Sequence, residues 1–273
     1  YVQTAVIGAK GSEHRFLHSL SDVATGPGDS IYALGDDEIR VFSFEGAFLR
    51  KWKVRPGTAC LETAPDGRIF TGSLGKVEVY ASTGEPAGSI EVGKPGAPAE
   101  VTAVKLMNNE LLVADVKTKI VYRYDLKGTQ LGVIGDKIKT GSFMLPNRWL
   151  DIDVAPDGIL YATDTGRHRV TGWLPDGTPV GSFGKFGMQD PSDFVGCCNP
   201  VNVAVTPDRH IVTAEKMVAR VKVFDPEGAL IAYIGPENFH PECRNIHLAV
   251  DSRGRILAAD PLRREIKIFA QPA

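Results

Sequence analysis

The chain has 273 residues and a formal net charge of −2, with 31 Lys and Arg against 33 Asp and Glu. This balance excludes a protein built mainly to bind nucleic acid, which needs a clear basic excess, and no apolar run reaches the roughly 20 residues that span a bilayer. The 29 Gly and 18 Pro residues favour a turn-rich, all-β fold. We therefore expect no nucleic-acid partner and no membrane span.

One pattern recurs along the whole chain: a strand of alternating apolar residues, a tight turn, and a second strand that often ends in an acidic residue. Residues 151–164 show it most clearly, with a Pro-Asp-Gly turn between the two strands. Such a repeat is typical of propellers and other repeat folds. The copies begin, in chain order, at Asp22, Cys60, Thr102, Asp151, Asn202 and His247.

A third strand with period-two alternation follows most copies, and a turn and a short fourth strand come after it. Four short strands in each of six repeats predict a single all-β domain, a six-bladed β-propeller with four-stranded antiparallel blades. We expect the blades at about residues 17–55, 56–94, 97–136, 146–186, 198–236 and 243–270.

The last repeat ends without a fourth strand, and the N-terminal segment supplies the missing pattern. Residues 3–10 match residues 130–137, which begin with a fourth strand, in phase. We therefore expect residues 2–8 to pair as the outer strand of the last blade, so that the N-terminal strand closes the ring. A closed ring hides sheet edges that would otherwise pair with other chains.

Two short segments carry a family resemblance. Residues 164–170, Asp-Thr-Gly-Arg-His-Arg-Val, are similar to the signature of the NHL repeat, and this resemblance covers essentially the whole chain. Residues 196–200, Gly-Cys-Cys-Asn-Pro, resemble an element of exported bacterial NHL proteins, in which a further Cys stands where this chain has Val195. The resemblance implies an exported protein, periplasmic or extracellular, and Tyr1 in place of Met agrees with a signal already removed.

The same resemblance implies a platform that binds a protein partner or a small ligand at the channel face. Related propellers include metal-dependent lyases and lactonases, which hold their metal with Asn, Asp or His just before the first strand of a blade. The equivalent positions here are almost entirely apolar, so we lean against an enzyme and keep a metal-dependent lyase or hydrolase as the alternative. These positions are Ser21, Ala59, Val101, Leu150, Val201 and Ile246.

Cysteine and histidine recur four residues before three of the repeats. Cys198 and Cys243 precede the fifth and sixth repeats, and His18 precedes the first, so the three loops are consecutive around a closed ring. Cys197 and His240 lie in the same loops. Thiolate and imidazole ligands suit copper, zinc or an iron–sulfur centre. These five residues predict a metal or redox site at the channel mouth of blades 5, 6 and 1.

Other roles for the cysteines stay open. A disulfide between Cys198 and Cys243 would join neighbouring blades and favour a purely structural interaction protein. Free thiols, inert or reactive, are a further possibility. The adjacent Cys197 and Cys198 are not expected to pair with each other, because the small ring that they would close is strained. Cys60 lies inside the second repeat and is expected in the core.

The remaining polar and apolar patterns point mainly to structure. We expect the acids at the ends of the second strands, Asp115, Asp164, Glu215 and Asp260, to bond the backbone of neighbouring loops. His247 is expected in the channel or the core. The long loops before blades 4 to 6 carry large apolar residues that either cap the blade cores or form a docking surface. These residues are Phe143, Met144, Trp149, Phe186, Met188, Phe194 and Phe239.

Overall fold

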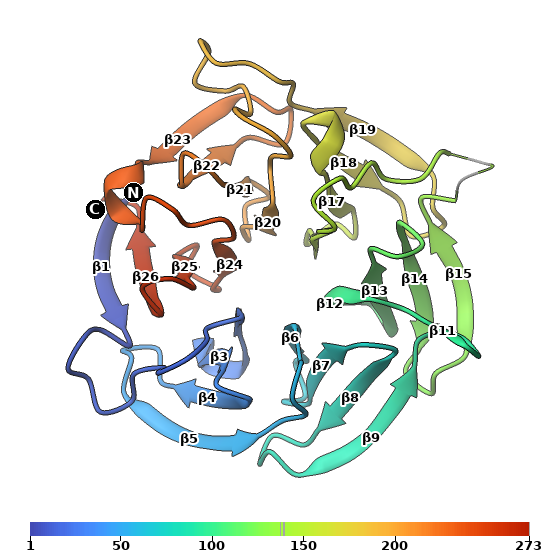
Figure 1. Ribbon diagram of the computed structural model, residues 1–273, viewed down its shortest axis with the longest axis horizontal. Coiled ribbons are helices and arrows are strands. Elements are labelled where there is room, and N and C mark those ends of the chain that lie inside the picture. Colours follow the sequence, from blue (N-terminus) through green and yellow to red (C-terminus); the bar gives the residue numbers. More distant parts are fainter. Residues whose placement is uncertain (137, 139, 273) are drawn as a thin grey trace.

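The computed structural model, which describes residues 1–136, 138 and 140–272, is a ring of six four-stranded antiparallel sheets around a central axis (Figure 1). Each sheet is one blade, with its first strand nearest the axis and its last strand on the rim. The prediction of an all-β, six-bladed propeller is confirmed. Helix in the described part of the chain is limited to short 3-10 turns, and none of them is long or apolar enough to cross a membrane.

The strands follow the order of the chain from the axis outward. Blade 1 contains β2 (Asp22–Thr25), β3 (Ile31–Gly35), β4 (Glu38–Phe42) and β5 (Phe48–Lys53), and blade 2 contains β6 (Cys60–Thr63), β7 (Ile69–Ser73), β8 (Lys76–Tyr80) and β9 (Pro86–Glu91). Blade 3 contains β12 (Val101–Met107), β13 (Glu110–Asp115), β14 (Ile120–Asp125) and β15 (Gln130–Ile134). A small hairpin of β10 (Gly93–Lys94) and β11 (Ala97–Pro98) lies between blades 2 and 3.

The second half of the ring is built in the same way. Blade 4 contains β16 (Ile152–Val154), β17 (Leu160–Asp164), β18 (Arg169–Trp173) and β19 (Pro179–Phe183). Blade 5 contains β20 (Asn202–Val205), β21 (Ile211–Glu215), β22 (Arg220–Phe224) and β23 (Leu230–Ile234). Blade 6 contains β24 (His247–Val250), β25 (Ile256–Asp260), β26 (Glu265–Ala270) and β1 (Val2–Ile7).

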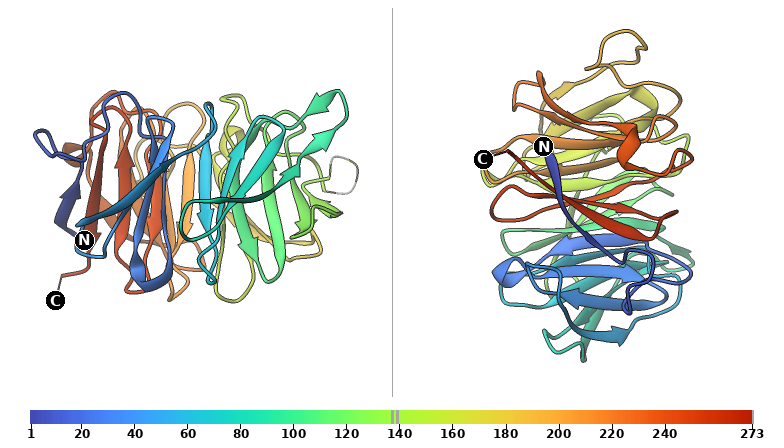
Figure 2. Two further views of the ribbon diagram at one scale, coloured as in Figure 1. Left: turned by 90° about the horizontal axis from the view of Figure 1, so that it is seen from below. Right: turned by 90° about the vertical axis from the view of Figure 1, so that its left-hand side faces the viewer.

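The N-terminal strand closes the ring, as the sequence predicts. β1 lies antiparallel beside β26, with Val2 opposite Ala270 and Ile7 opposite Ile266. It takes the outer position in the order β1-β26-β25-β24. Figures 1 and 2 show the two chain ends side by side at one edge of the molecule. The closing blade is therefore held by sheet hydrogen bonds between the two ends of the chain.

The second strand of each blade is deeply buried, because neighbouring blades cover both of its faces. All five residues of β3, β17 and β21 are buried, whereas the rim strand β5 alternates between half-buried and exposed residues. Apolar clusters fill the space between adjacent blades, and one of them joins Val221 of blade 5 to Ile256 and Phe269 of blade 6. Packing between blades thus makes one continuous ring of core.

The strand directions give the propeller two unlike faces, seen edge-on in Figure 2. The face that carries the loops between blades and the turns between second and third strands is called the upper face. The lower face carries the remaining turns. Because the first strands run from the upper to the lower face, Asp22, Asn202 and His247 at their beginnings lie at the upper mouth of the channel.

Candidate functional site

Buried carboxylates at the upper ends of the second strands anchor the long upper-face loops. Asp260 is fully buried and accepts the backbone N–H of His240 at 2.7 Å. The prediction that these recurrent acids bond loop backbone is confirmed, and it explains how the upper face keeps its shape. In the same way, the carboxylates of Asp115, Asp164 and Glu215 accept the backbone N–H groups of Glu100, Met144 and Val195, respectively.

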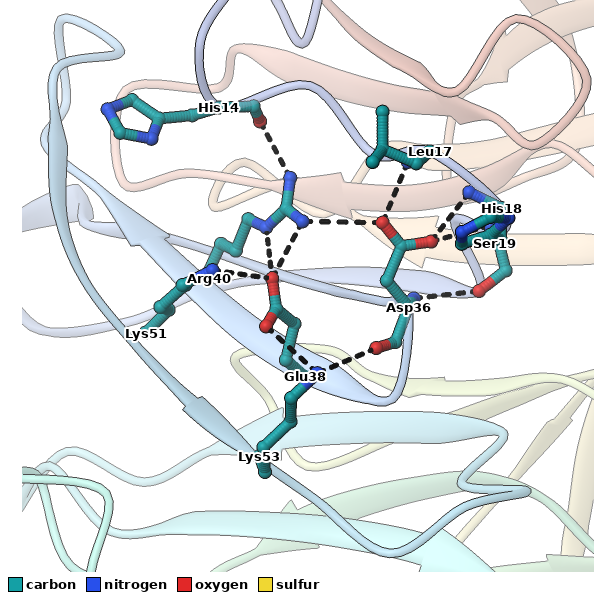
Figure 3. Close-up of polar contacts among 9 residues, drawn as sticks. All are labelled: His14, Leu17, His18, Ser19, Asp36, Glu38, Arg40, Lys51 and Lys53. Carbon is teal, nitrogen blue, oxygen red and sulfur yellow. Dashed lines mark hydrogen bonds and ion pairs between the residues drawn. The ribbon is translucent and has the colours of Figure 1, made fainter.

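In blade 1 the anchor is Asp36, which the repeat pattern does not reveal because it stands one residue later than in the other blades. Its carboxylate oxygens accept the backbone N–H groups of Leu17, His18 and Ser19 at 2.7–2.8 Å (Figure 3). Burial alone would raise the pKa of Asp36, but these donors and the charge of Arg40 outweigh it and lower the pKa. The loop is thus held by its backbone, and the His18 side chain is exposed.

Arg40 of β4 ties the same loop to the sheet. Its guanidinium lies 2.6 Å from Glu38 and 3.3 Å from Asp36, and it donates to the backbone oxygen of His14 at 2.9 Å (Figure 3). The same group stacks over the ring of Phe16 at 4.1 Å. Arginines on the third strands of blades 4 and 5, Arg169 and Arg220, pair with Asp164 and Glu215 in the same way.

The channel below the mouth is filled by charged side chains of the first strands. Lys105 of β12 lies 3.1 Å from Glu62 of β6 and 3.3 Å from Asp153 of β16. Burial raises the pKa of Glu62 to about 7 and that of Asp151 to about 8, in spite of the attraction from Lys105. The void among these strands measures about 20 Å³, room for about one water molecule. The channel interior is therefore too narrow for an organic ligand.

A polar network lies at the upper mouth of the channel. His247 faces Asp22 through Nδ1 at 3.4 Å and Asn245 through Nε2 at 3.1 Å. Asn202 donates to Asn245 at 2.6 Å and accepts the indole N–H of Trp149 at 3.1 Å. The Trp149 and His247 rings meet edge-on, with their centroids 5.5 Å apart. His247 is thus a nearly buried channel residue, and both of its ring nitrogens have polar neighbours.

Of the five residues predicted to form a metal or redox site, the structure brings Cys197 and Cys198 together, with their Sγ atoms 2.8 Å apart. Cys243 is buried in the core between blades 5 and 6, where burial and then the charge of Asp260 raise its pKa to about 12. The ring of His240 accepts the backbone N–H of Glu242 at 3.2 Å. The described residues contain no group of three or more His, Cys, Asp or Glu that could hold a metal ion.

The four cysteines of the chain are free thiols. Cys198 and Cys243 are therefore not joined across blades 5 and 6, and these blades are held together by packing. Cys60 is buried in the core between blades 2 and 3, as expected for a small apolar side chain. Cys197 is the exposed cysteine.

Large apolar side chains are exposed mainly on the upper face and the rim strands. In the described part of the chain, Leu174 is the sole such residue in a lower-face turn. The upper-face residues are Leu17, Leu74, Ile138, Met144, Phe186, Met188, Met217, Val218 and Leu262.

The long loops before blades 4 to 6 contain apolar residues of two kinds, buried ones that cap the blade cores and exposed ones. Phe143, Phe194 and Phe239 are buried and cap the blade cores. Phe186 is 56 % exposed and Met188 is 79 % exposed, so these side chains face solvent. The sequence alone does not separate the two groups, because both consist of large apolar residues in loops of similar composition.

An open pocket of about 610 Å³ lies between the upper turns of blades 5 and 6. Met217 comes from the turn of blade 5, and Leu262 from the turn of blade 6. Asn245 links the pocket to the mouth network through its contact with His247. Apolar walls beside a few polar groups are typical of sites for ligands or partner side chains. The other lining residues are Glu242, Arg244 and Pro261.

No protein-family model matches the chain. Among solved structures, it is similar to a chain of the mitotic checkpoint complex, with a TM-score of 0.69 and 9% identity over 100% of this chain and 95% of that one. It is also similar to the WD40 β-propeller domain of Doa1, with a TM-score of 0.65 and 11% identity over 99% and 97% of the two chains.

A third similar structure is a catalytically inactive H270A virginiamycin B lyase from Staphylococcus aureus with quinupristin. It has a TM-score of 0.63 and 10% identity, over 92% of this chain and 80% of that one. At these identities the likeness shows the propeller fold alone, which hosts both binding proteins and enzymes.

Proposed function

We propose that this protein is an exported NHL-type propeller that acts as a rigid binding platform, with the pocket between blades 5 and 6 as the place where a protein partner docks. The observation that carries the proposal is the one-sided exposure of large apolar residues, which leaves the lower-face turns nearly free of them. Met217 and Leu262 of that set line the pocket. The plugged channel supports a surface site rather than a ligand deep inside the ring.

The charges around the pocket favour a partner with acidic groups. Arg244 lines the pocket and is exposed, and Lys216 and Arg264 flank its two turns. Glu242 is the acidic residue in the lining. Complementary charges steer a partner and fix its orientation. We therefore propose a partner segment in which an apolar side chain enters the pocket and neighbouring carboxylates face the basic rim.

The finer parts of this proposal have separate supports. Export rests on the resemblance of residues 196–200 to exported NHL proteins, and fractionation of the native cell tests it. Metal binding by Cys197, Cys198, Cys243, His18 and His240 stays a prediction of the sequence, and metal analysis of untagged protein tests it. The described residues do not gather three such ligands at one point, so we assign no chemistry to a metal.

Selection of displayed peptides on the immobilised propeller tests the docking site. We expect enriched peptides to combine an apolar residue with Asp or Glu, and to lose binding when Met217→Asp and Leu262→Asp are introduced together. Leu174→Asp is the matched control, because it places the same charge at an exposed apolar residue of the lower face. Peptides that bind all variants equally would place the partner elsewhere.

A further inference from the structure

The loop before blade 5 holds two neighbouring thiols side by side. The Sγ atoms of Cys197 and Cys198 are 2.8 Å apart, although successive side chains of an extended chain point to opposite sides. Cys198 has a φ of 64°, in the left-handed region that residues with a side chain rarely adopt. This backbone turn places both sulfur atoms on the same side of the loop.

Hydrogen bonds of the buried side chains of Asn199 and Glu215 fix the loop on either side of the pair. Asn199 is fully buried and donates to the backbone oxygens of Val195 at 2.6 Å and Lys216 at 3.1 Å. Its Oδ1 accepts the N–H of Lys216 at 2.9 Å, and Glu215 accepts the N–H of Val195 at 3.0 Å. The turn at Cys198 is therefore held by the blade, which keeps the two thiols side by side.

The two thiols differ in access. Cys197 is exposed on the upper face, whereas Cys198 is 4% exposed. Burial, and then the neighbouring Cys197 thiol, raise the pKa of Cys198. An external disulfide can thus reach Cys197, while Cys198 is placed to attack Cys197 Sγ once that sulfur carries the external group. This is the arrangement of an attacking and a resolving cysteine.

We propose that Cys197 and Cys198 are a thiol–disulfide exchange pair on the upper face, whose oxidant is a disulfide of low molecular weight or of a protein. The Cys197 thiolate attacks one sulfur of that disulfide, which breaks the external S–S bond and releases one thiolate. A mixed disulfide on Cys197 results. Cys198 then gives its proton to solvent and attacks Cys197 Sγ, which releases the second thiolate and closes the Cys197–Cys198 bond. This pairing departs from the expectation drawn from the sequence: the ring is strained, and strain makes a disulfide easily reduced, which suits reversible exchange rather than a permanent link.

The reaction balances within these partners. The two cysteine thiols lose two electrons and two protons, and the external disulfide takes them up as two thiols. The reverse reaction oxidises an external dithiol. The pair does not depend on the docking proposed for the neighbouring pocket, since every atom that reacts belongs to residues 197 and 198 or to the external disulfide.

The test uses the complete chain, equilibrated in glutathione buffers from fully reduced to fully oxidised, quenched in acid, alkylated and digested for mass spectrometry. We expect the peptide that contains residues 197 and 198 to lose two hydrogen atoms as the buffer becomes oxidising. A peptide that keeps both thiols in fully oxidised glutathione, or that stops as a mixed disulfide with glutathione, overturns the proposal.

Two variants separate the roles of the thiols. Cys198→Ser should accumulate glutathione on Cys197, because the resolving thiol is gone. Cys197→Ser should take up none on Cys198, because that thiol is buried. Equal glutathione uptake by both variants contradicts the assigned roles. The wild-type measurement stands by itself if either variant unfolds, as the circular dichroism of each variant will show.

Discussion

The Asp260 carboxylate accepts the backbone N–H of His240 at 2.7 Å, so the second strand of blade 6 fixes the course of the loop that enters that blade. Asp36, Asp115, Asp164 and Glu215 make the same kind of bond in four further blades. Buried carboxylates therefore position the loops that form the upper face. The shape of the pocket between blades 5 and 6 depends on these loops.

Replacing Asp260 by Ala should lower the free energy of unfolding by about 2–4 kcal/mol, because several backbone N–H groups lose a fully buried acceptor. Asp260 also accepts the backbone N–H groups of Leu262 and Arg263, which belong to the turn beside the pocket. Urea denaturation measures the change. Glu85→Ala is the control, since Glu85 is an exposed carboxyl in a lower-face turn. Equal losses in the two variants would contradict the anchoring role.

Closure of the ring by β1 should dominate the thermal stability of the protein. Deleting residues 1–9 removes the strand that covers the edge of β26, and we expect a sharp fall of the thermal midpoint. Ile7→Ala should cost about 2–4 kcal/mol, because Ile7 is buried in the core between blades 6 and 1. Val2→Ala, at a half-exposed position of the same strand, should stay near wild type. An unchanged midpoint after the deletion would show that β1 does not close the ring.

The fold could be predicted from the sequence because each blade repeats the same alternation and turn. Asp22, Cys60, Asn202 and His247, four of the six positions at which the repeats begin, are the first residues of first strands. The closing strand was predictable for the same reason. A repeated pattern predicts the features that every blade has, and the pairing and packing of strands are such features.

The site could be predicted only in part, because it lies in loops where the blades differ. Equal spacing placed Cys198, Cys243 and His18 together, yet Cys243 is in the core and His18 is exposed. The loops before the blades differ in length. Residues at the same distance before their first strands therefore point in different directions and do not lie close together in space. The contact between Cys197 and Cys198 depends on the left-handed φ of Cys198, for which the sequence carries no signal.

The channel carboxylates should make the protein less stable as the pH rises. Asp151 has an ordinary pKa of 3.8 when unfolded and one of about 8 when folded, raised by burial. Between these values the folded protein keeps a proton that the unfolded chain releases, so stability falls from about pH 4 to about pH 8. Asp151→Asn cannot ionise and should escape this loss.

Denaturation of Asp151→Asn and wild type across this range measures the effect. The stability of the variant relative to wild type should grow by about 1–3 kcal/mol between pH 4 and pH 8. Glu62→Gln should show a smaller gain, because the pKa of Glu62 rises only to about 7. A constant difference for Asp151→Asn would mean that the buried carboxyl ionises normally.

Thiol accessibility should follow burial, with one rapidly reacting cysteine in the native reduced protein. Cys197 is exposed, whereas Cys60 is 3% exposed and Cys243 is fully buried. Burial raises the pKa of both buried thiols, well above the ordinary value for Cys60, so little reactive thiolate is present at neutral pH. Brief alkylation with N-ethylmaleimide and mass spectrometry should therefore find the label on Cys197, and denaturant should expose all four cysteines. Cys197→Ser should abolish the rapid phase, while rapid labelling of Cys243 would contradict its place in the core and reopen its role as a ligand.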